Sequence, residues 1–377
     1  MNIPFFILSP CGTSLLTHGL DPDMRTAINH HTNAKTEGEI KDGSPNDHQR
    51  IIKHLETVRS LIAAADANTA KKCSAELNGI ISLYCGKLSD RKGDIHQLLC
   101  TDTWLGEAAA KIVKDWLVKQ GFTCILKRQT DLRTVDFLAF KMALSDLVQW
   151  CEEEISPYRH SHHVVFNLTG GFKSIQGFLQ TLAQFYADET VYIFETGNEL
   201  LRLPRLPLKM DADVIIRQHL DTFRCLVLGI RIPGSKTEGI PETLLMVDGN
   251  QICLSPWGDL VWAQTKKNLY TEMIFPPPGN CLKFGPDFVK SVAEIEAHRK
   301  VMVNERIDDL VRFLEDRKNG NPNPRNPRSL DFKKLAGNPN PPSTHECDAW
   351  HDQDAKRLFG HFEDEFFVLD RLAKALH

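Results

Sequence analysis

Apolar stretches of strand length alternate with apolar residues at helical spacing along the first 200 residues. The short runs predict strands at 2–8, 121–127, 163–166 and 191–194. The longer periodic segments predict helices that begin at Leu15 and Ile175 and others at 104–119 and 132–153. Strands that alternate with helices are typical of an α/β domain with a mostly parallel, doubly wound, Rossmann-like sheet.

A polar insertion separates the first strand–helix unit from the rest of this domain. Residues 29–50 are rich in Gly, Asn and Asp and are predicted to form a loop. Residues 47–68 and 69–86 are predicted to form two helices, so that a helical insertion at about 47–86 lies beside the sheet.

The junction between strand 163–166 and the following helix is the most informative stretch of the chain. It contains Gly170, Gly171 and Lys173. Backbone N–H groups at a helix start, glycines that allow close approach and a lysine together form a place where phosphate can be held. A second turn of small polar residues follows strand 2–8, and ligands of such folds bind at the carboxyl ends of the strands.

The middle of the chain predicts a small module after a Pro-rich exit at 201–207. A helix is expected at 211–229, an Asp-Gly hairpin at 244–254 and another periodic segment at 256–267. Helices plus a hairpin favour a winged-helix-like module at 211–275, and a packing connector between domains is the alternative. Few basic residues occur here, so DNA binding is not indicated.

A Pro-Pro-Pro-Gly linker at 276–279 precedes the last segment, 282–377. Its pattern predicts two helices followed by a series of strands, which is an α+β arrangement. The expected strand at 282–284 precedes helices at 288–299 and 301–317, a Pro/Asn/Arg loop at 318–328, and strands at 330–335, 343–350, 356–362 and 365–372.

Composition narrows the class of protein only moderately. The 377 residues are 42% hydrophobic and 25% charged, with a net charge of −4, so any basic surface must be local. No apolar run approaches the ~18 residues of a membrane span. The ten cysteines form no C-x-x-C pair, which favours free buried thiols and a cytoplasmic location.

Three segments of the first domain together resemble the CARF domains, the CRISPR-associated Rossmann-fold sensors. They are the runs Pro-Cys-Gly-Thr-Ser-Leu-Leu at 10–16, Asn-Leu-Thr-Gly-Gly-Phe-Lys at 167–173 and a segment that begins at Glu195 and ends with Leu-Pro-Arg-Leu-Pro at 203–207. The resemblance covers residues 1–210 and implies a homodimer whose two domains form one pocket for cyclic tetra-adenylate. The binding residues that it implies are Gly12, Thr13, Ser14, Asn167, Thr169, Gly170, Gly171 and Lys173. Asn167 would read an adenine edge or a ribose hydroxyl.

Residues 282–377 resemble the RelE/HigB family of ribosome-dependent mRNA interferases. The order of elements is similar, and the local matches are at 330–335, His345-Glu346, 356–359 and 367–374. In this family no metal is used: the RNA 2′-hydroxyl attacks its own phosphate, and the protein stabilises charge and moves protons. Arg357 stands at the family's central catalytic position, and its guanidinium suits a pentavalent phosphorane.

The resemblance implies further site residues. The other catalytic candidates are His345, Glu346, His351, Arg371 and Lys374, with His361 and His377 as weaker ones. The residues expected to contact RNA are Lys333, Lys334, Arg325 and Arg328. RelE has a lysine pair where this chain has His345 and Glu346, so the identity of the general base stays open. Residues 282–377 contain 16 Lys and Arg against 17 Asp and Glu, which departs from the usual basic character of the family.

The whole chain thus resembles the CRISPR-associated mRNA interferases, in which a CARF sensor, a winged helix-turn-helix and a RelE domain are fused. Such a protein would be a type III CRISPR–Cas effector, with cyclic tetra-adenylate as allosteric activator and no cofactor. It would cleave mRNA in the ribosomal A site and cause growth arrest in antiviral defence. The chain lacks the sequence motifs of the HEPN and PD-D/ExK nucleases, which are fused to other CARF domains. The remaining alternative is a CARF-controlled transcriptional regulator that uses the 211–275 module.

Overall fold

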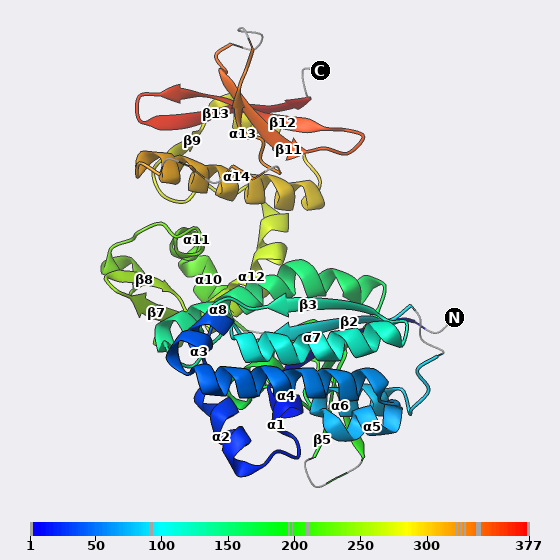
Figure 1. The fold of residues 1–377 in the computed structure, drawn as a ribbon. Helices are drawn as coiled ribbons and strands as arrows, with labels where there is room; N and C mark the ends of the chain where they lie inside the picture. The colour runs from blue at the N-terminus through cyan, green and yellow to red at the C-terminus, as the bar shows by residue number, and fades with distance from the viewer. Residues whose placement is uncertain are drawn as a thin grey trace. The chain divides into compact units, whose positions relative to one another are not determined.

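The computed structural model describes residues 3–89, 93–194, 197, 199–208, 211–321, 323–324, 326–327, 329–336 and 341–374. The chain divides into two compact units, unit 1 at Met1–Lys209 and unit 2 at Met210–His377 (Figure 1). Over the described part of the chain, no helix combines the length and apolarity needed to cross a membrane.

Unit 1 is organised around a six-stranded sheet of order β3-β2-β1-β4-β5-β6. Its strands are β1 Phe5–Cys11, β2 Ile95–Cys100, β3 Thr123–Arg128, β4 His163–Asn167, β5 Glu189–Ile193 and β6 Leu200–Pro204. All neighbours pair in parallel except β5 and β6. Strand β1 is central and almost fully buried because its apolar residues face helices on both sides of the sheet. The expected α/β domain with a mostly parallel sheet is therefore confirmed.

Helices cover both faces of this sheet. In Figure 1, α7 runs along strands β2 and β3, and α4 lies beside α7. The helices of unit 1 are α1 Ser14–Thr17, α2 Pro22–His30, α3 Glu37–Gly43, α4 Pro45–Ala64, α5 Ala67–Cys73, α6 Ala75–Leu83, α7 Trp104–Lys119, α8 Phe137–Trp150 and α9 Lys173–Tyr186. A π-helical turn, Cys151–Ile155, and a 3-10 turn, Ser156–His160, extend α8.

Two predictions for unit 1 were wrong. Residues 29–50 are not a loop, because they contain α3 and the start of α4. The Thr36 hydroxyl caps α3 by accepting from the Glu39 N–H, and Pro45 begins α4. The insertion between β1 and β2 thus contains α2 to α6 rather than two helices. Strands β2 and β6 were not predicted.

The first part of unit 2 contains three main helices and a hairpin. They are α10 Asp213–Gln218, α11 Leu220–Val227, α12 Pro256–Glu272 and the hairpin of β7 Leu245–Asp248 with β8 Gln251–Leu254; short 3-10 turns lie at Gly234–Thr237 and Glu242–Leu244. The single helix expected at 211–229 is interrupted at His219. The Asp-Gly hairpin forms as predicted, and Gly249 adopts a φ of +57° in its turn.

The second part of unit 2 is a five-stranded sheet of order β10-β11-β12-β13-β9 packed on α14. Its elements are β9 Leu282–Phe284, α13 Pro286–Ser291, α14 Ala297–Lys318, β10 Lys333–Lys334, β11 His345–Trp350, β12 Lys356–Glu363 and β13 Phe366–Lys374. Two boundaries differ from the expectation. The helix predicted at 288–299 ends at Ser291, and the strand predicted at 330–335 shortens to β10.

A buried ion pair joins the two parts of unit 2. Arg224 of α11, whose side chain is 2% exposed, lies 2.6 Å from the carboxylate of Asp308 on α14. Tyr270 of α12 donates its hydroxyl to the same carboxylate at 2.5 Å. The nearby Asn304 donates to the backbone carbonyl of Met273 at 2.8 Å. These polar contacts are satisfied and buried, so they fix the 211–275 module against α14.

Candidate functional sites

The switch point of the unit 1 sheet lies between β1 and β4. The chain continues from β1 to β2 on one side and from β4 to β5 on the other, so the carboxyl ends of β1 and β4 open a crevice. The turns at 12–14 and 168–172, which the sequence singled out, meet there. A Cβ on Gly12 would lie 2.9 Å from the Gly171 carbonyl oxygen, and Gly171 has a φ of +100°. Both positions therefore require glycine.

The predicted phosphate cradle at these turns is filled by Glu76, a buried residue of α6. One carboxylate oxygen accepts hydrogen bonds at 3.1 Å from the backbone N–H groups of both Gly12 and Gly171. The other accepts from the hydroxyls of Ser74 at 2.8 Å and Ser14 at 3.4 Å. The donors expected to hold a ligand phosphate are thus engaged by an anion of the chain itself.

Two of the predicted ligand residues lie inside the fold. The Asn167 side chain is fully buried, and its amide nitrogen donates to Ser9 Oγ and to the Glu76 carbonyl, both at 3.1 Å. Its amide oxygen accepts from the Thr169 N–H at 3.3 Å. Asn167 thus holds the turn in place and does not offer its amide to a ligand. Gly170 packs against Glu76, because a Cβ there would lie 2.5 Å from the Glu76 carboxyl carbon.

Beside this cradle, a crevice of about 180 Å³ opens at the ends of β1, β2 and β4. Hydroxyl, guanidinium and aromatic groups share its wall. The lining residues are Gly12, Thr13, Thr32, Asn33, Thr101, Thr103, Leu132, Arg133, Thr134, Phe140, Phe172 and Ser174. Only Gly12 and Thr13 of this set were predicted. The Thr101-Asp102-Thr103 segment could have been found from the sequence if β2 had been recognised, because it directly follows that strand.

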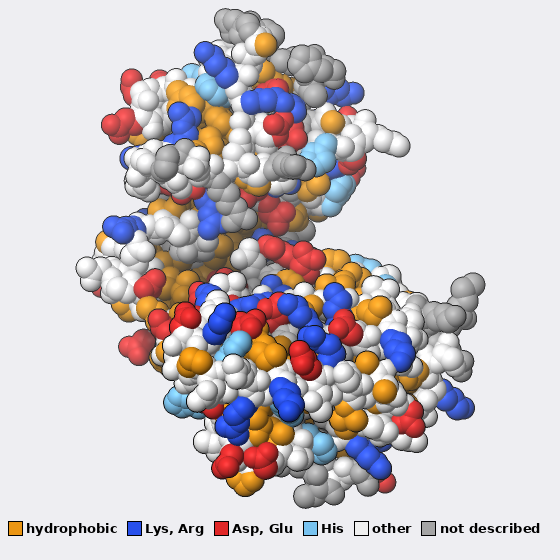
Figure 2. Space-filling model, viewed as in Figure 1, with side chains coloured by type: hydrophobic (Ala, Val, Ile, Leu, Met, Phe, Trp, Pro, Cys, Tyr) orange, Lys and Arg blue, Asp and Glu red, His pale blue; other side chains and the backbone are white. Residues whose placement is uncertain are grey.

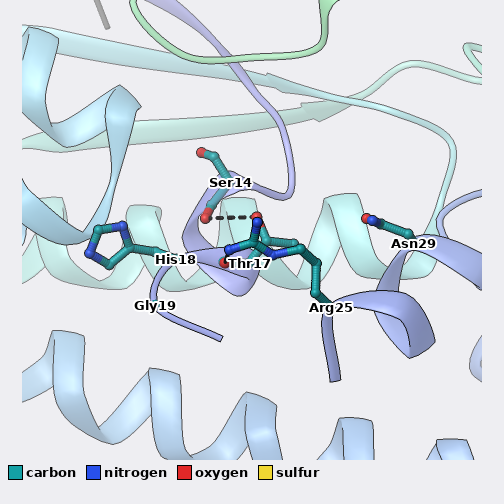
Figure 3. Close-up of a pocket in the computed structure, with 6 residues that line it drawn as sticks. All are labelled: Ser14, Thr17, His18, Gly19, Arg25 and Asn29. Carbon is teal, nitrogen blue, oxygen red and sulfur yellow. Dashed lines mark hydrogen bonds between the residues drawn. The ribbon is translucent and has the colours of Figure 1, made fainter. Parts of the chain in front are cut away.

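A second hollow adjoins the Gly12–Ser14 turn (Figure 3). It measures about 660 Å³ and is lined by Ser14, Thr17, His18, Gly19, Arg25 and Asn29. It is wide and open, and Arg25 bonds only weakly to the Thr17 carbonyl, at 3.5 Å. Lys173 is exposed at the first residue of α9. The two hollows share the hydroxyl-bearing turn at 12–14, so a ligand in either one would contact it.

In unit 2, Arg357 lies on the face of the second sheet that turns away from α14. We call this the outer face; its side chains come from Glu346, Asp348, Arg357, Phe359, His361, Asp370 and Arg371, and Ser343 contacts it through Asp370. Arg357 forms an ion pair with Glu346 and lies 2.8 Å from Asp348 and 3.2 Å from Asp331. Lys333, 2.6 Å from Asp331, lowers the pKa of that carboxyl, and Arg357 adds to the effect. Three carboxylates therefore surround the predicted catalytic guanidinium.

The structure separates His345 from Glu346, although they are neighbours in sequence. His345 stacks on Phe332, with ring centroids 5.3 Å apart, on the α14 side of the sheet. Burial lowers the pKa of His345, and Lys334 and Arg317 lower it further. Adjacent residues of a strand point to opposite faces, so the two cannot act together on one substrate atom. Of these two candidates, only Glu346 shares a face of the sheet with Arg357.

The other predicted residues of unit 2 are spread over the second sheet and its loops. His351 is 65% exposed, with Nδ1 3.4 Å from Asp348. Lys374 is exposed and lies 3.7 Å from Asp354. Lys334 is exposed on β10, and Arg371 stands opposite Phe359. The remaining candidates, Arg325, Arg328, Glu195 and His377, lie outside the described residues. Across the described ranges, no group of three His, Cys, Asp or Glu side chains is placed to hold a metal ion.

Residues 71–206 match the family described as CRISPR-associated protein (Cas_APE2256). The match indicates a CRISPR-associated protein. The matched segment contains Glu76, strands β2 to β6 and the turn after β4, and therefore most of the switch-point crevice. It does not reach β1 or unit 2.

Proposed function

We propose that this chain is a ligand-controlled CRISPR effector. In this proposal unit 1 binds cyclic tetra-adenylate as a CARF sensor, and unit 2 is a RelE-type endoribonuclease that the ligand activates. The observation that carries the proposal is the crevice at the ends of β1, β2 and β4. Most of the residues that line it belong to the segment 71–206, which matches CRISPR-associated proteins. Its wall combines hydrogen-bond donors that suit phosphate groups with aromatic rings that suit a nucleobase.

The crevice suggests how the ligand is held. Its volume of about 180 Å³ is small for a ring of four nucleotides, so one copy of the chain would enclose only part of the ring. A second copy, related by a two-fold axis, would enclose the rest. Because Glu76 occupies the Gly12 and Gly171 N–H groups, the phosphates would instead contact the hydroxyls of Thr13 and Ser174 and the guanidinium of Arg133. Phe140 and Phe172 would pack against adenine.

The proposed reaction in unit 2 is transesterification of mRNA on the ribosome. The 2′-oxygen forms a bond to the adjacent phosphorus, the bond from phosphorus to the 5′-oxygen breaks, and a 2′,3′-cyclic phosphate and a 5′-hydroxyl result. Arg357 would stabilise the added negative charge of the phosphorane. Since three carboxylates now surround Arg357, the substrate phosphate would replace Asp331, whose side chain is 41% exposed, against 4% for Glu346. The reaction needs no metal in this proposal.

The alternative of a DNA-binding regulator gains little from the 211–275 module. Several of its cations are paired with carboxylates of the same unit. Arg217 contacts Glu272 and Asp213, Lys236 contacts Asp221, and Arg224 is buried against Asp308. The face seen in Figure 2 likewise shows Lys and Arg interspersed with Asp and Glu. A role as the connector between sensor and effector accounts better for this pairing.

Calorimetry with cyclic tetra-adenylate tests the sensor. Arg133→Ala is expected to weaken binding roughly ten- to a hundredfold, the size of one charge-assisted hydrogen bond, and Lys173→Ala to weaken it less. Arg25→Ala, in the second hollow, is the matched control and should leave the affinity unchanged. If Arg25→Ala abolished binding and Arg133→Ala did not, the ligand would lie in the hollow of Figure 3 instead.

A cleavage assay tests the effector. A defined mRNA is incubated with the full chain, with and without ribosomes and with and without cyclic tetra-adenylate. The expected result is cleavage only when both are present. Arg357→Ala should abolish cleavage while binding cyclic tetra-adenylate with unchanged affinity. Full-rate cleavage of naked RNA would contradict the RelE-type mechanism, and no cleavage in any arm would contradict the proposed activity altogether.

A further inference from the structure

A bulge in β13 places two charged residues side by side on the outer face. Phe359 of β12 pairs with Arg371, but the next residue, Gly360, pairs with Leu369, so Asp370 is the extra residue of β13. Leu369 and Leu372 both belong to the core under the sheet. Asp370 and Arg371 therefore both point to the outer face, an arrangement that regular alternation would forbid.

Asp370 orients a histidine. Its carboxylate accepts a hydrogen bond from the hydroxyl of the buried Ser343 at 2.7 Å and lies 3.0 Å from Nδ1 of His361. A carboxylate at Nδ1 keeps the proton on that nitrogen, which leaves the lone pair of Nε2 available as an acceptor. The His361 side chain is 25% exposed and that of Asp370 is 12% exposed, so the imidazole can be reached while its partner is held.

His361 lies on the outer face together with Arg357 and its carboxylate partners. Arg357, Phe359 and His361 alternate along β12, and Glu346 pairs with Phe359 from β11. His361 is thus diagonal to Glu346, a relationship that places their Cα atoms about 7–8 Å apart. Arg371 stands across Phe359 on the other side, and among the described residues it has no hydrogen-bond or ion-pair partner. The buried phenyl ring of Phe359 is thus surrounded by the His361 imidazole, the Glu346 carboxylate and the guanidinium of Arg371.

We propose that His361 is the general base of the RNA cleavage assigned to unit 2, with Asp370 and Ser343 as positioning residues; this inference rests on the proposed function. Nε2 takes the proton of the 2′-hydroxyl as the bond from the 2′-oxygen to phosphorus forms. The bond to the 5′-oxygen breaks, and that oxygen takes a proton from solvent water. Arg371 holds a non-bridging phosphate oxygen. Glu346 is unsuited to this role because Arg357 fixes its carboxylate.

The test measures single-turnover cleavage by the full chain with ribosomes and cyclic tetra-adenylate. His361→Gln is expected to slow cleavage about a hundredfold or more, the usual contribution of a general base. His298→Gln, an exposed histidine of α14, is the matched control and should cleave at the wild-type rate. Asp370→Asn should slow cleavage and change its pH profile, because the amide no longer fixes the tautomer.

Rescue of cleavage by added imidazole separates a general base from a residue that only supports the fold. His361→Ala should regain part of its activity with imidazole, and Arg357→Ala should not. If wild type and a folded His361→Gln variant cleaved at rates within a factor of about two, this inference would be overturned and the proposed function would stand. If His361→Ala were inactive with and without imidazole while His361→Gln was active, the base assignment would fail equally. No cleavage by the wild type in any arm would overturn both.

Discussion

Glu76 accepts a hydrogen bond at 3.1 Å from the backbone N–H of Gly171, a residue 95 positions later in the chain. The same oxygen accepts from the Gly12 N–H at 3.1 Å. One carboxylate of α6 thus ties together the two turns that follow β1 and β4. These turns meet at the switch point of the sheet, so the geometry of the candidate ligand crevice depends on a side chain that does not line it.

Removing this carboxylate should loosen both turns. Glu76→Ala leaves two N–H groups without a partner, and each such group costs about 1–3 kcal/mol when buried. The free energy of unfolding of unit 1 is expected to fall by about 3 kcal/mol, with faster hydrogen exchange at Gly12 and Gly171. Glu56→Ala, an exposed glutamate of α4, is the control. Unchanged exchange at both glycines would contradict the role given to Glu76.

Gly171 and Gly177 offer a matched pair of substitutions. At Gly171 the backbone has a φ of +100°, and a new Cβ would lie 2.9 Å from Pro10. Gly171→Ala should therefore distort the turn, lower stability and weaken cyclic tetra-adenylate binding in calorimetry. At Gly177, inside α9, nothing lies within 4 Å of a new Cβ. Gly177→Ala should stabilise the helix by up to about 1 kcal/mol. Equal effects at the two sites would show that turn geometry does not matter for binding.

The buried pair of Arg224 and Asp308 should be costly to break. Asp308→Ala leaves the Arg224 guanidinium buried without its carboxylate and removes the acceptor of the Tyr270 hydroxyl. A loss of about 3–5 kcal/mol in the free energy of unfolding of unit 2 is expected from urea titration. The exposed pair of Arg217 and Glu272 is the comparison, and Glu272→Ala should change stability little. A small effect of Asp308→Ala would mean that the two parts of unit 2 are held mainly by apolar contacts.

His96 should make the stability of unit 1 depend on pH. Complete burial in β2 lowers the pKa of His96 to about 3, so the folded state keeps it neutral. In the unfolded chain it takes up a proton below about pH 6.5. The unfolded state then binds more protons, so stability is full above pH 6.5 and falls as pH decreases toward 3, by about 1.4 kcal/mol per pH unit. The difference between wild type and His96→Gln isolates this contribution. Parallel curves for the two proteins between pH 6.5 and 4 would contradict it.

The main α/β pattern could be predicted because buried parallel strands are short apolar runs. Strand β2 escaped prediction because His96 and Gln97 interrupt its apolar pattern. Both are buried in the structure, where the Tyr84 hydroxyl lies 3.1 Å from His96 Nε2 and Gln97 donates to the Ile125 carbonyl at 3.5 Å. Polar residues inside a sheet are stable only when tertiary partners exist, and a local pattern does not reveal them.

The candidate sites likewise contain residues that a local sequence pattern reveals and residues that depend on tertiary contacts. The turns with Gly12 and Gly171 could be located from the sequence because their glycines serve local backbone geometry. Glu76 could not be located, since its partners lie in distant parts of the chain. The separation of His345 from Glu346 follows from the two-residue period of a strand and was foreseeable. The bulge at Asp370 was not, because it depends on the register between β12 and β13.

The central position of β1 has a consequence for how the protein is made. Strand β1 is synthesised before both of its neighbours, which begin at Ile95 and His163. At synthesis rates of roughly 5–20 residues per second, the second neighbour emerges roughly ten to thirty seconds after β1. During that time an apolar strand with an open hydrogen-bonding edge must be shielded. Helix α6, which packs against β1 in the structure, is synthesised before either neighbouring strand and can cover one face of β1.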